Sequence, residues 1–237
     1  MADLGGRRLK LAVPGQSGGL RLLLERSWPT QPDQGLLGEL ERLLAEYGGP
    51  LWLCSSRPAA VKAWQASTAI APHLRVVTAE QVPIARETSG TGSDRLLAAL
   101  AASQRSNGAC LIADLGTAWT LDCVDEQQVF RGGAIGPGLT VQVDALAAAC
   151  PHLDAPASED QEAIPKQTAT AVRAGTLLAL ATTLQGLADR WQETIGPAPR
   201  YLSGGDAAQL APLLGPDWTT TEHLVLHGLA IAAERLD

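Results

Sequence analysis

The residues of this sequence that could do chemistry cluster at turns where an aspartate precedes a glycine. Asp114-Leu115-Gly116-Thr117 follows an apolar run, 109–113, and precedes 119–124, where apolar and polar residues alternate. This pattern predicts a buried strand, a tight turn and a returning strand. Glycine lets backbone N–H groups approach an anion and Thr117 adds a short donor, while the carboxylate suits a cation that a phosphate also contacts. A hairpin in which Asp114 only caps its own turn explains the same residues.

A second Asp-x-Gly turn lies at the start of the chain. Asp3-Leu4-Gly5-Gly6 leads into an alternating strand that carries Lys10 and ends at Val13. Each half of the chain therefore begins with the same kind of turn, which indicates a coarse repeat of two α/β halves. We expect a first lobe over residues 1–107 and a second lobe over residues 108–237.

A third group of polar residues stands directly before an Ala/Leu-rich run. Gly92-Ser93-Asp94-Arg95 precedes 96–102, whose composition predicts a helix. In the simplest interpretation, Ser93 or Asp94 caps this helix and Arg95 is a solvated charge. In the functional interpretation, the helix start attracts an anion, Arg95 binds a carboxylate by two contacts, and Asp94 accepts a proton from a substrate hydroxyl.

Further glycines in the second half suggest places where the backbone approaches another group. The run 132–138 is glycine-rich and predicts a close approach of backbone to ligand. A long helix is expected to begin near Thr168 and to reach Trp191, with close packing at Gly175. Gly204-Gly205 joins a short strand to a helix. This join could hold the sugar and base of a nucleotide, or it could be an ordinary turn.

Composition excludes several classes of function. The 237 residues are enough for a full core in one large domain or two smaller ones. A net charge of −7, from 18 basic and 25 acidic residues, argues against a general nucleic-acid surface.

No apolar run approaches the ~20 residues of a membrane span, and the first eight residues contain no signal-peptide core. The expectation is a soluble, cytoplasmic protein whose four separated cysteines are mostly buried free thiols.

Taken together, these motifs resemble the type III pantothenate kinases in order and spacing. The resemblance runs from about Asp3 to the end of the chain, and each motif is weak alone but specific in combination. The matching segments are 92–95, 114–118, 132–139, Thr168, 203–207 and 224–229.

The resemblance implies an α/β fold made of two ribonuclease H-like lobes of the actin-like ATPase and sugar kinase superfamily. Such lobes face each other across a cleft and grip the phosphates of ATP. The implied activity is ATP-dependent phosphorylation of pantothenate to 4′-phosphopantothenate, the first step of coenzyme A synthesis. The family uses ATP with a divalent metal such as Mg²⁺, needs K⁺ or NH₄⁺, and is homodimeric.

The resemblance also assigns roles to individual residues. Asp94 matches the catalytic base, and Asp114 matches the ligand of the monovalent cation. The residues that match pantothenate contacts are Gly92, Ser93, Arg95 and Thr168, the last supplied at a dimer interface. The residues assigned to ATP binding are Asp3, Gly5, Gly6, Lys10, Gly116, Thr117, Gly204 and Gly205.

The sequence departs from the family pattern at its first phosphate turn. Gly6 stands where the family has asparagine, and Arg7 stands where it has threonine or serine. A tyrosine that often precedes the Gly-x-Asp-Arg motif is missing, with Thr88 near its place. Either the true start lies upstream of Met1 or this turn has drifted. Two other functions therefore stay open: a kinase for a different small alcohol, and a non-catalytic binding or regulatory protein with a degenerate ATP loop.

Overall fold

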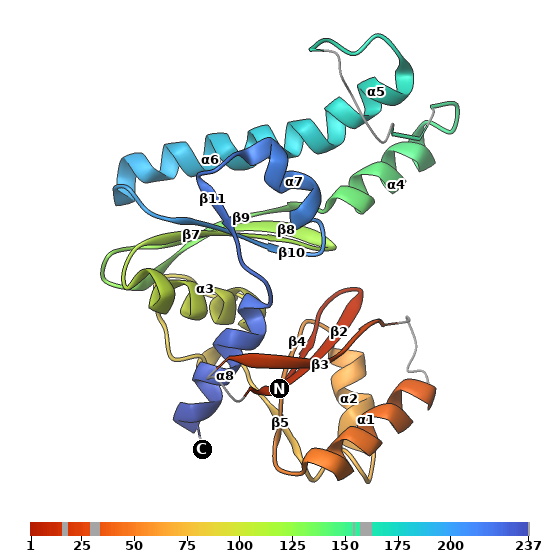
Figure 1. The fold of residues 1–237 in the computed structure, drawn as a ribbon, viewed down its shortest axis with the longest axis vertical. Coiled ribbons are helices and arrows are strands. Elements are labelled where there is room, and N and C mark those ends of the chain that lie inside the picture. The colour runs from red at the N-terminus through yellow and green to blue at the C-terminus, as the bar shows by residue number, and fades with distance from the viewer. Residues whose placement is uncertain (16–18, 29–33, 154, 157–162, 237) are drawn as a thin grey trace. The chain divides into compact units, whose positions relative to one another are not determined.

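The computed structural model describes residues 1–15, 19–28, 34–153, 155–156 and 163–236. The chain packs as two compact units, each built on its own sheet (Figure 1). The first unit comprises Met1–Gln104 and His223–Asp237, and the second comprises Arg105–Glu222. The expected lobes, 1–107 and 108–237, differ from these units mainly because the end of the chain returns to the first unit.

The sheet of the first unit has the strand order β3-β2-β1-β4-β5. β1 is antiparallel to β2 and parallel to β4. One face of the sheet is apolar and packs on two helices, α1 and α2, around the buried side chains of Leu4, Leu53 and Trp64. The bounds are β1 Ala2–Leu4, β2 Arg8–Pro14, β3 Leu20–Ser27, α1 Gln34–Tyr47, β4 Leu51–Ser55, α2 Pro58–Ala66 and β5 Leu74–Val76.

The last helix, α8 (Leu224–Leu236), belongs to the first unit because its apolar face is buried there. It packs against β1 and β4, and Leu226 and Leu229 are fully buried. Gly228 brings it close to α3 (Ser93–Ser106), since a Cβ at Gly228 would collide with the backbone carbonyl of Leu97. The short elements before α3 are η1 (Ala79–Gln81) and β6 (Ala85–Arg86).

The sheet of the second unit contains the order β11-β10-β7-β8-β9. β7, β8 and β9 form an antiparallel meander, whereas β10 runs parallel to β7 and to β11. The helices α6 and α7 cover an apolar core that includes Leu115, Leu184 and Leu202. The bounds are β7 Cys110–Leu115, β8 Ala118–Val124, β9 Val129–Pro137, α6 Ala179–Ile195, β10 Arg200–Gly204, α7 Ala207–Leu214 and β11 Trp218–Thr220.

Most of the glycine run 132–138 belongs to a strand, since β9 continues to Pro137. Its glycines allow β9 to lie tightly on β8. A Cβ at Gly136 would lie 2.5 Å from the ring of Trp119. Gly132 has φ +109° next to an irregularity in the pairing of the two strands, a conformation that favours glycine.

The long helix expected from Thr168 to Trp191 is confirmed, and it contains one π-helical turn. α5 (Thr168–Arg173) passes into a π-helical turn at Ala174–Leu178, and α6 follows to Ile195. The prediction of close packing at Gly175 is wrong, since this residue is exposed and a Cβ there would meet nothing within 4 Å. The remaining helix of this unit is α4 (Leu139–Ala149).

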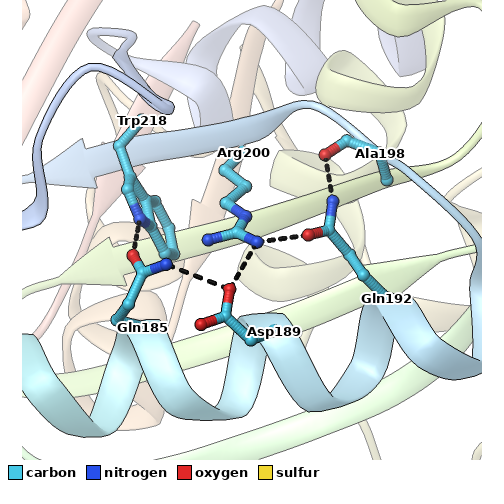
Figure 2. Close-up of polar contacts among 6 residues, drawn as sticks. All are labelled: Gln185, Asp189, Gln192, Ala198, Arg200 and Trp218. Atoms are coloured by element: carbon cyan, nitrogen blue, oxygen red, sulfur yellow. Dashed lines mark hydrogen bonds and ion pairs between the residues drawn. The ribbon is translucent and has the colours of Figure 1, made fainter.

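A polar cluster joins α6 to the strands of the second unit (Figure 2). The Arg200 side chain is 9% exposed, and its Nη2 donates to Asp189 Oδ1 at 2.7 Å and to Gln192 Oε1. Gln185 donates to the same Asp189 oxygen at 3.0 Å and accepts the Trp218 indole N–H at 2.9 Å. The cluster therefore ties helix and sheet together through one buried guanidinium.

Candidate functional site

In the first unit, Asp3 shares a face of the sheet with two other polar positions. It pairs directly with Lys10 on β2 and with Cys54 on β4. Directly paired residues of neighbouring strands point to the same face. The adjacent residues Leu4, Leu9 and Leu53 belong to the apolar core on the other face. The alternation of β1 therefore places the Asp3 carboxylate on the polar face.

The turn after Asp3 is tight and partly exposed. The Gly5 N–H donates to the carbonyl oxygen of Arg8 at 3.0 Å, which closes the turn between β1 and β2. Gly6 and Arg7 are exposed. Across from them, the end of β4 is hydrogen-bonded to the end of β1, because the Ser56 N–H and the Ser55 hydroxyl both donate to the Leu4 carbonyl at 3.3 Å.

The Asp94 carboxylate lies half-buried in the first turn of α3. Its Oδ1 accepts the backbone N–H of Arg95 at 2.9 Å, so the residue helps to satisfy the helix start. Gly92 leaves room for this carboxylate, since a Cβ there would lie 2.5 Å from Asp94 Oδ1. The hydroxyl of Ser93 lies 3.5 Å from the sulfur of Cys54. The candidate residues Ser93 and Asp94 thus also make local contacts at the start of the helix.

The Cys54 thiol lies near both the Asp3 and the Asp94 carboxylates. It is fully buried, and burial raises its pKa, with further increases from the nearby Asp3 and Asp94 carboxylates and an opposing effect of the Ser93 hydrogen bond. The thiol is therefore neutral at physiological pH. The structure brings Asp3, Cys54, Ser93 and Asp94 together, and Cys54 is the member that sequence reasoning missed. The available signal was its place near the end of an apolar strand, 51–55.

In the second unit, Asp114 and the turn that follows it form a compact backbone structure. The Gly116 N–H donates to the Ala118 carbonyl at 3.0 Å, and the Gly138 N–H donates to the Thr117 carbonyl at 2.9 Å. A Cβ at Gly138 would collide with the Gly116 carbonyl, so glycine is required there. Gly116 and Thr117 are exposed.

Gly204 lies against Asp114 at the end of β10. The parallel register pairs Ser203 with Asp114 and Gly204 with Leu115. Gly204 has φ +96°, and a Cβ there would lie 2.6 Å from Asp114 Oδ1 and collide with the Leu115 backbone. The Asp206 N–H donates to the Leu115 carbonyl at 3.1 Å. The structure therefore brings the strand–glycine–helix join next to the Asp114 carboxylate.

Thr168 stands apart from these residues. It is the first residue of α5 and is exposed, and within the described part of the chain its hydroxyl makes no hydrogen bond. Nothing in the second unit alone places it beside the Asp114 turn.

The carboxylates of the two Asp-x-Gly turns suit a cation that phosphate oxygens also coordinate. Among the described residues there is no group of three or more His, Cys, Asp or Glu side chains that could hold a metal ion. Asp3 and Asp114 each offer a half-buried carboxylate next to exposed backbone of a turn. Magnesium is commonly held by one or two carboxylates together with substrate phosphates. The residues present fit that arrangement better than a cage made by protein alone.

The described helices also bear on the class of protein. None of them combines the length and the apolar character that crossing a membrane requires.

Comparison of the sequence with known families matches residues 3–190 to the model of type III pantothenate kinase. A relative of that name from Synechococcus sp. (strain JA-2-3B'a(2-13)) is 36% identical over 166 residues, which cover 67% of this chain and 65% of the relative. One from Alkalilimnicola ehrlichii is 39% identical over 147 residues, covering 61% and 59%. The match to these relatives thus spans less than two thirds of their length.

Comparison of the fold with solved structures gives matches over nearly the whole chain at low identity. A Campylobacter jejuni protein described as a Baf family transcriptional activator has a TM-score of 0.67 at 15% identity, covering 99% of this chain and 97% of its own. The activator of 2-hydroxyisocaproyl-CoA dehydratase from Clostridium difficile has 0.52 at 11%, covering 99% and 95%. A 2-dehydro-3-deoxygalactonokinase from Sinorhizobium meliloti has 0.52 at 15%, covering 99% and 98%. The expected fold of the actin-like ATPase and sugar kinase superfamily is confirmed.

Proposed function

The chain belongs to the type III pantothenate kinase family, and we propose that it transfers the γ-phosphoryl group of ATP to the hydroxyl of pantothenate. The product is 4′-phosphopantothenate, and the reaction is the first step of coenzyme A synthesis. The observation that carries the proposal is the family match over residues 3–190, which includes both Asp-x-Gly turns and the start of α3.

Asp94 is the proposed base. Its carboxylate takes the proton of the pantothenate hydroxyl while the hydroxyl oxygen attacks the γ-phosphorus of ATP. As the new O–P bond forms, the bond between the γ-phosphorus and the bridging oxygen of the β-phosphate breaks. ADP then leaves. Support comes from its half-buried place in the first turn of α3, beside Ser93 and near Asp3. Gly92, Ser93 and Arg95 are assigned to pantothenate, with Arg95 matching its carboxylate. Phosphoryl transfer of this kind depends mainly on positioning and on charge stabilisation.

We assign the phosphate contacts of ATP to two turns, one in each unit. In the first unit they are Gly5, Gly6 and Lys10, while the Asp3 carboxylate takes part in ATP binding through the Mg²⁺ that accompanies the nucleotide. In the second unit they are the exposed Gly116 and Thr117; the Gly116 N–H is bonded to the Ala118 carbonyl, and the Thr117 hydroxyl is the proposed donor. Gly204 and Gly205 are assigned to the rest of the nucleotide, supported by the contact of Gly204 with Asp114.

Two cations belong to the proposal. Asp114 would hold a monovalent cation, K⁺ or NH₄⁺, and Asp3 would face the Mg²⁺ that accompanies ATP. When bound, these ions would neutralise phosphate charge. The chain's own contribution is to hold each carboxylate in place: the Asp3 position is fixed by pairing with Lys10 and Cys54, and that of Asp114 by pairing with Ser203.

A homodimer is also proposed, with Thr168 acting at its interface. Support comes from apolar surface around α4 and α5. α4 has an apolar sequence but no buried residue, Leu178 of the π-helical turn is 47% exposed, and Ile164 is 79% exposed. Exposed apolar surface of this kind is typical of protein–protein interfaces. A cytoplasmic location is proposed too, supported by three buried cysteines that remain free thiols.

The test is a coupled ADP assay with pantothenate and a panel of other small alcohols, with Mg²⁺ and with or without K⁺. We expect ADP formation that depends on pantothenate and increases with K⁺. Turnover of another alcohol in preference to pantothenate would assign a different kinase. Absence of turnover, with no heat on titration of ATP and Mg²⁺ in a calorimeter, would favour the non-catalytic alternative.

A further inference from the structure

The segment that follows β4 contacts the turn between β1 and β2, which is the first phosphate turn of the proposed ATP site. β1 and β4 are parallel neighbours, so their carboxyl ends lie side by side, which is where ligands bind in open α/β sheets. Ser55 and Ser56 donate to the Leu4 carbonyl at the end of β1. The Ser55 hydroxyl in turn accepts the Arg57 backbone N–H at 3.0 Å. These bonds fix Arg57 beside the turn.

The Arg57 side chain reaches the turn itself. Its Nη1 donates to the backbone carbonyl of Gly6 at 3.1 Å. A guanidinium carries five N–H donors, and within the described part of the chain this bond is the one interaction of the Arg57 side chain. No carboxylate among the described residues pairs with it, so within this part of the chain its positive charge has no ion-pair partner.

Two basic residues of β2 near this turn are in a different situation. The Arg8 guanidinium forms an ion pair with Glu25 at 2.8 Å. Lys10 faces Glu25 in the β2–β3 register and helps to lower the pKa of that carboxyl. Arg57 therefore combines a fixed position, spare donors and a charge that no acidic side chain in the described chain neutralises.

We propose that Arg57 is a phosphate-binding residue of the ATP site, acting on the first phosphate turn from the segment after β4. The inference rests on the proposed function, because it takes ATP as the ligand of that turn. Gly6 and Arg7 lack the small amide and hydroxyl that the family pattern has there. The guanidinium of Arg57, docked on the Gly6 carbonyl, supplies donors and charge for phosphate oxygens in their place.

The test compares the binding of ADP with Mg²⁺ and of adenosine to wild type and to the variants Arg57→Ala, Arg57→Gln and Arg57→Lys by calorimetry. We expect Arg57→Ala to weaken ADP binding about 10- to 100-fold, as for loss of charged hydrogen bonds, and to leave adenosine binding unchanged. Arg57→Gln keeps a donor for Gly6 but loses the charge, so it should also weaken ADP binding. Arg57→Lys should restore part of it.

Arg75→Ala is the matched control, because Arg75 also donates to backbone carbonyls, those of Pro72 and Leu74, on an exposed part of the same unit. It should bind ADP like wild type. Unchanged ADP affinity in Arg57→Ala, full recovery in Arg57→Gln, or equal losses for ADP and adenosine would overturn the inference. Wild type that binds ADP through Arg57 but does not phosphorylate pantothenate would overturn only the proposed function.

Discussion

Gly204 provides a sharp test of how the second unit holds Asp114. Its φ of +96° is costly for alanine, and a Cβ would lie 2.6 Å from Asp114 Oδ1 and collide with the Leu115 backbone. Gly215 is the matched control in the same unit: it has φ +79°, but a Cβ there meets nothing within 4 Å. The pair separates backbone strain from collision.

The magnitudes follow from these two terms. Gly215 has φ +79° and ψ −171°, a backbone conformation almost exclusive to glycine, and such rare positive-φ conformations cost alanine about 1–3 kcal/mol. Overpacking adds about 1–3 kcal/mol. Gly215→Ala should therefore lose about 1–3 kcal/mol, and Gly204→Ala about 2–6 kcal/mol, of the free energy of unfolding. For chains of this size each kcal/mol corresponds to a Tm shift of about 2–4 °C.

The assay is thermal unfolding by circular dichroism, paired with the K⁺ dependence of pantothenate phosphorylation. Because the added Cβ would displace the Asp114 carboxylate, Gly204→Ala should also need more K⁺ for half-maximal activity, and Gly215→Ala should not. Equal Tm shifts and equal K⁺ requirements in the two variants would refute the packing of Gly204 on Asp114.

Three further predictions concern other parts of the chain. Asp189→Ala should lower the free energy of unfolding by about 1–2 kcal/mol in urea titrations, because it leaves the buried Arg200 guanidinium without its carboxylate partner. The loss stays this small because the Asp189 side chain is 55% exposed and solvent already screens its charge; an unchanged free energy of unfolding would contradict this. At pH 8, iodoacetamide should label Cys150 first, because burial raises the pKa of Cys110 to about 12 and of Cys123 to about 11; peptide mapping that finds either buried thiol modified first would disprove it. Leu178→Asp should shift the sedimentation coefficient from dimer to monomer, and an unchanged dimer would remove this surface from the interface.

The sequence was sufficient to predict the local features of the site. Asp-x-Gly turns between alternating strands have a strong local signature, so the turns after Asp3 and Asp114 were found where they were expected. The same holds for the helix that begins at Ser93, because composition and a possible cap agree there. These features depend on residues that are neighbours in the chain.

What could not be predicted depends on pairing between distant segments. Cys54 contacts Ser93 because β4 pairs with β1 and α3 lies nearby. Arg57 reaches Gly6 because the pairing of β1 and β4 brings the ends of these two strands together. The glycines of 132–138 indicate a loop when taken alone, since glycine weakens a strand, yet the ring of Trp119 requires one of them inside β9. The π-helical turn at Ala174–Leu178 within the long helix likewise has no clear signal in the local sequence.

In the proposed reaction, the Asp94 carboxylate accepts the proton of pantothenate during phosphoryl transfer. The most direct measurement is single-turnover formation of 4′-phosphopantothenate, followed by mass spectrometry, for wild type and Asp94→Asn with ATP, Mg²⁺ and K⁺. Asparagine is nearly isosteric and should leave the fold and the affinity for pantothenate intact. We expect a phosphorylated product from wild type and a rate lowered by ~10²–10⁴-fold in the variant. An unchanged rate in Asp94→Asn, or no phosphorylated pantothenate from wild type, would contradict it.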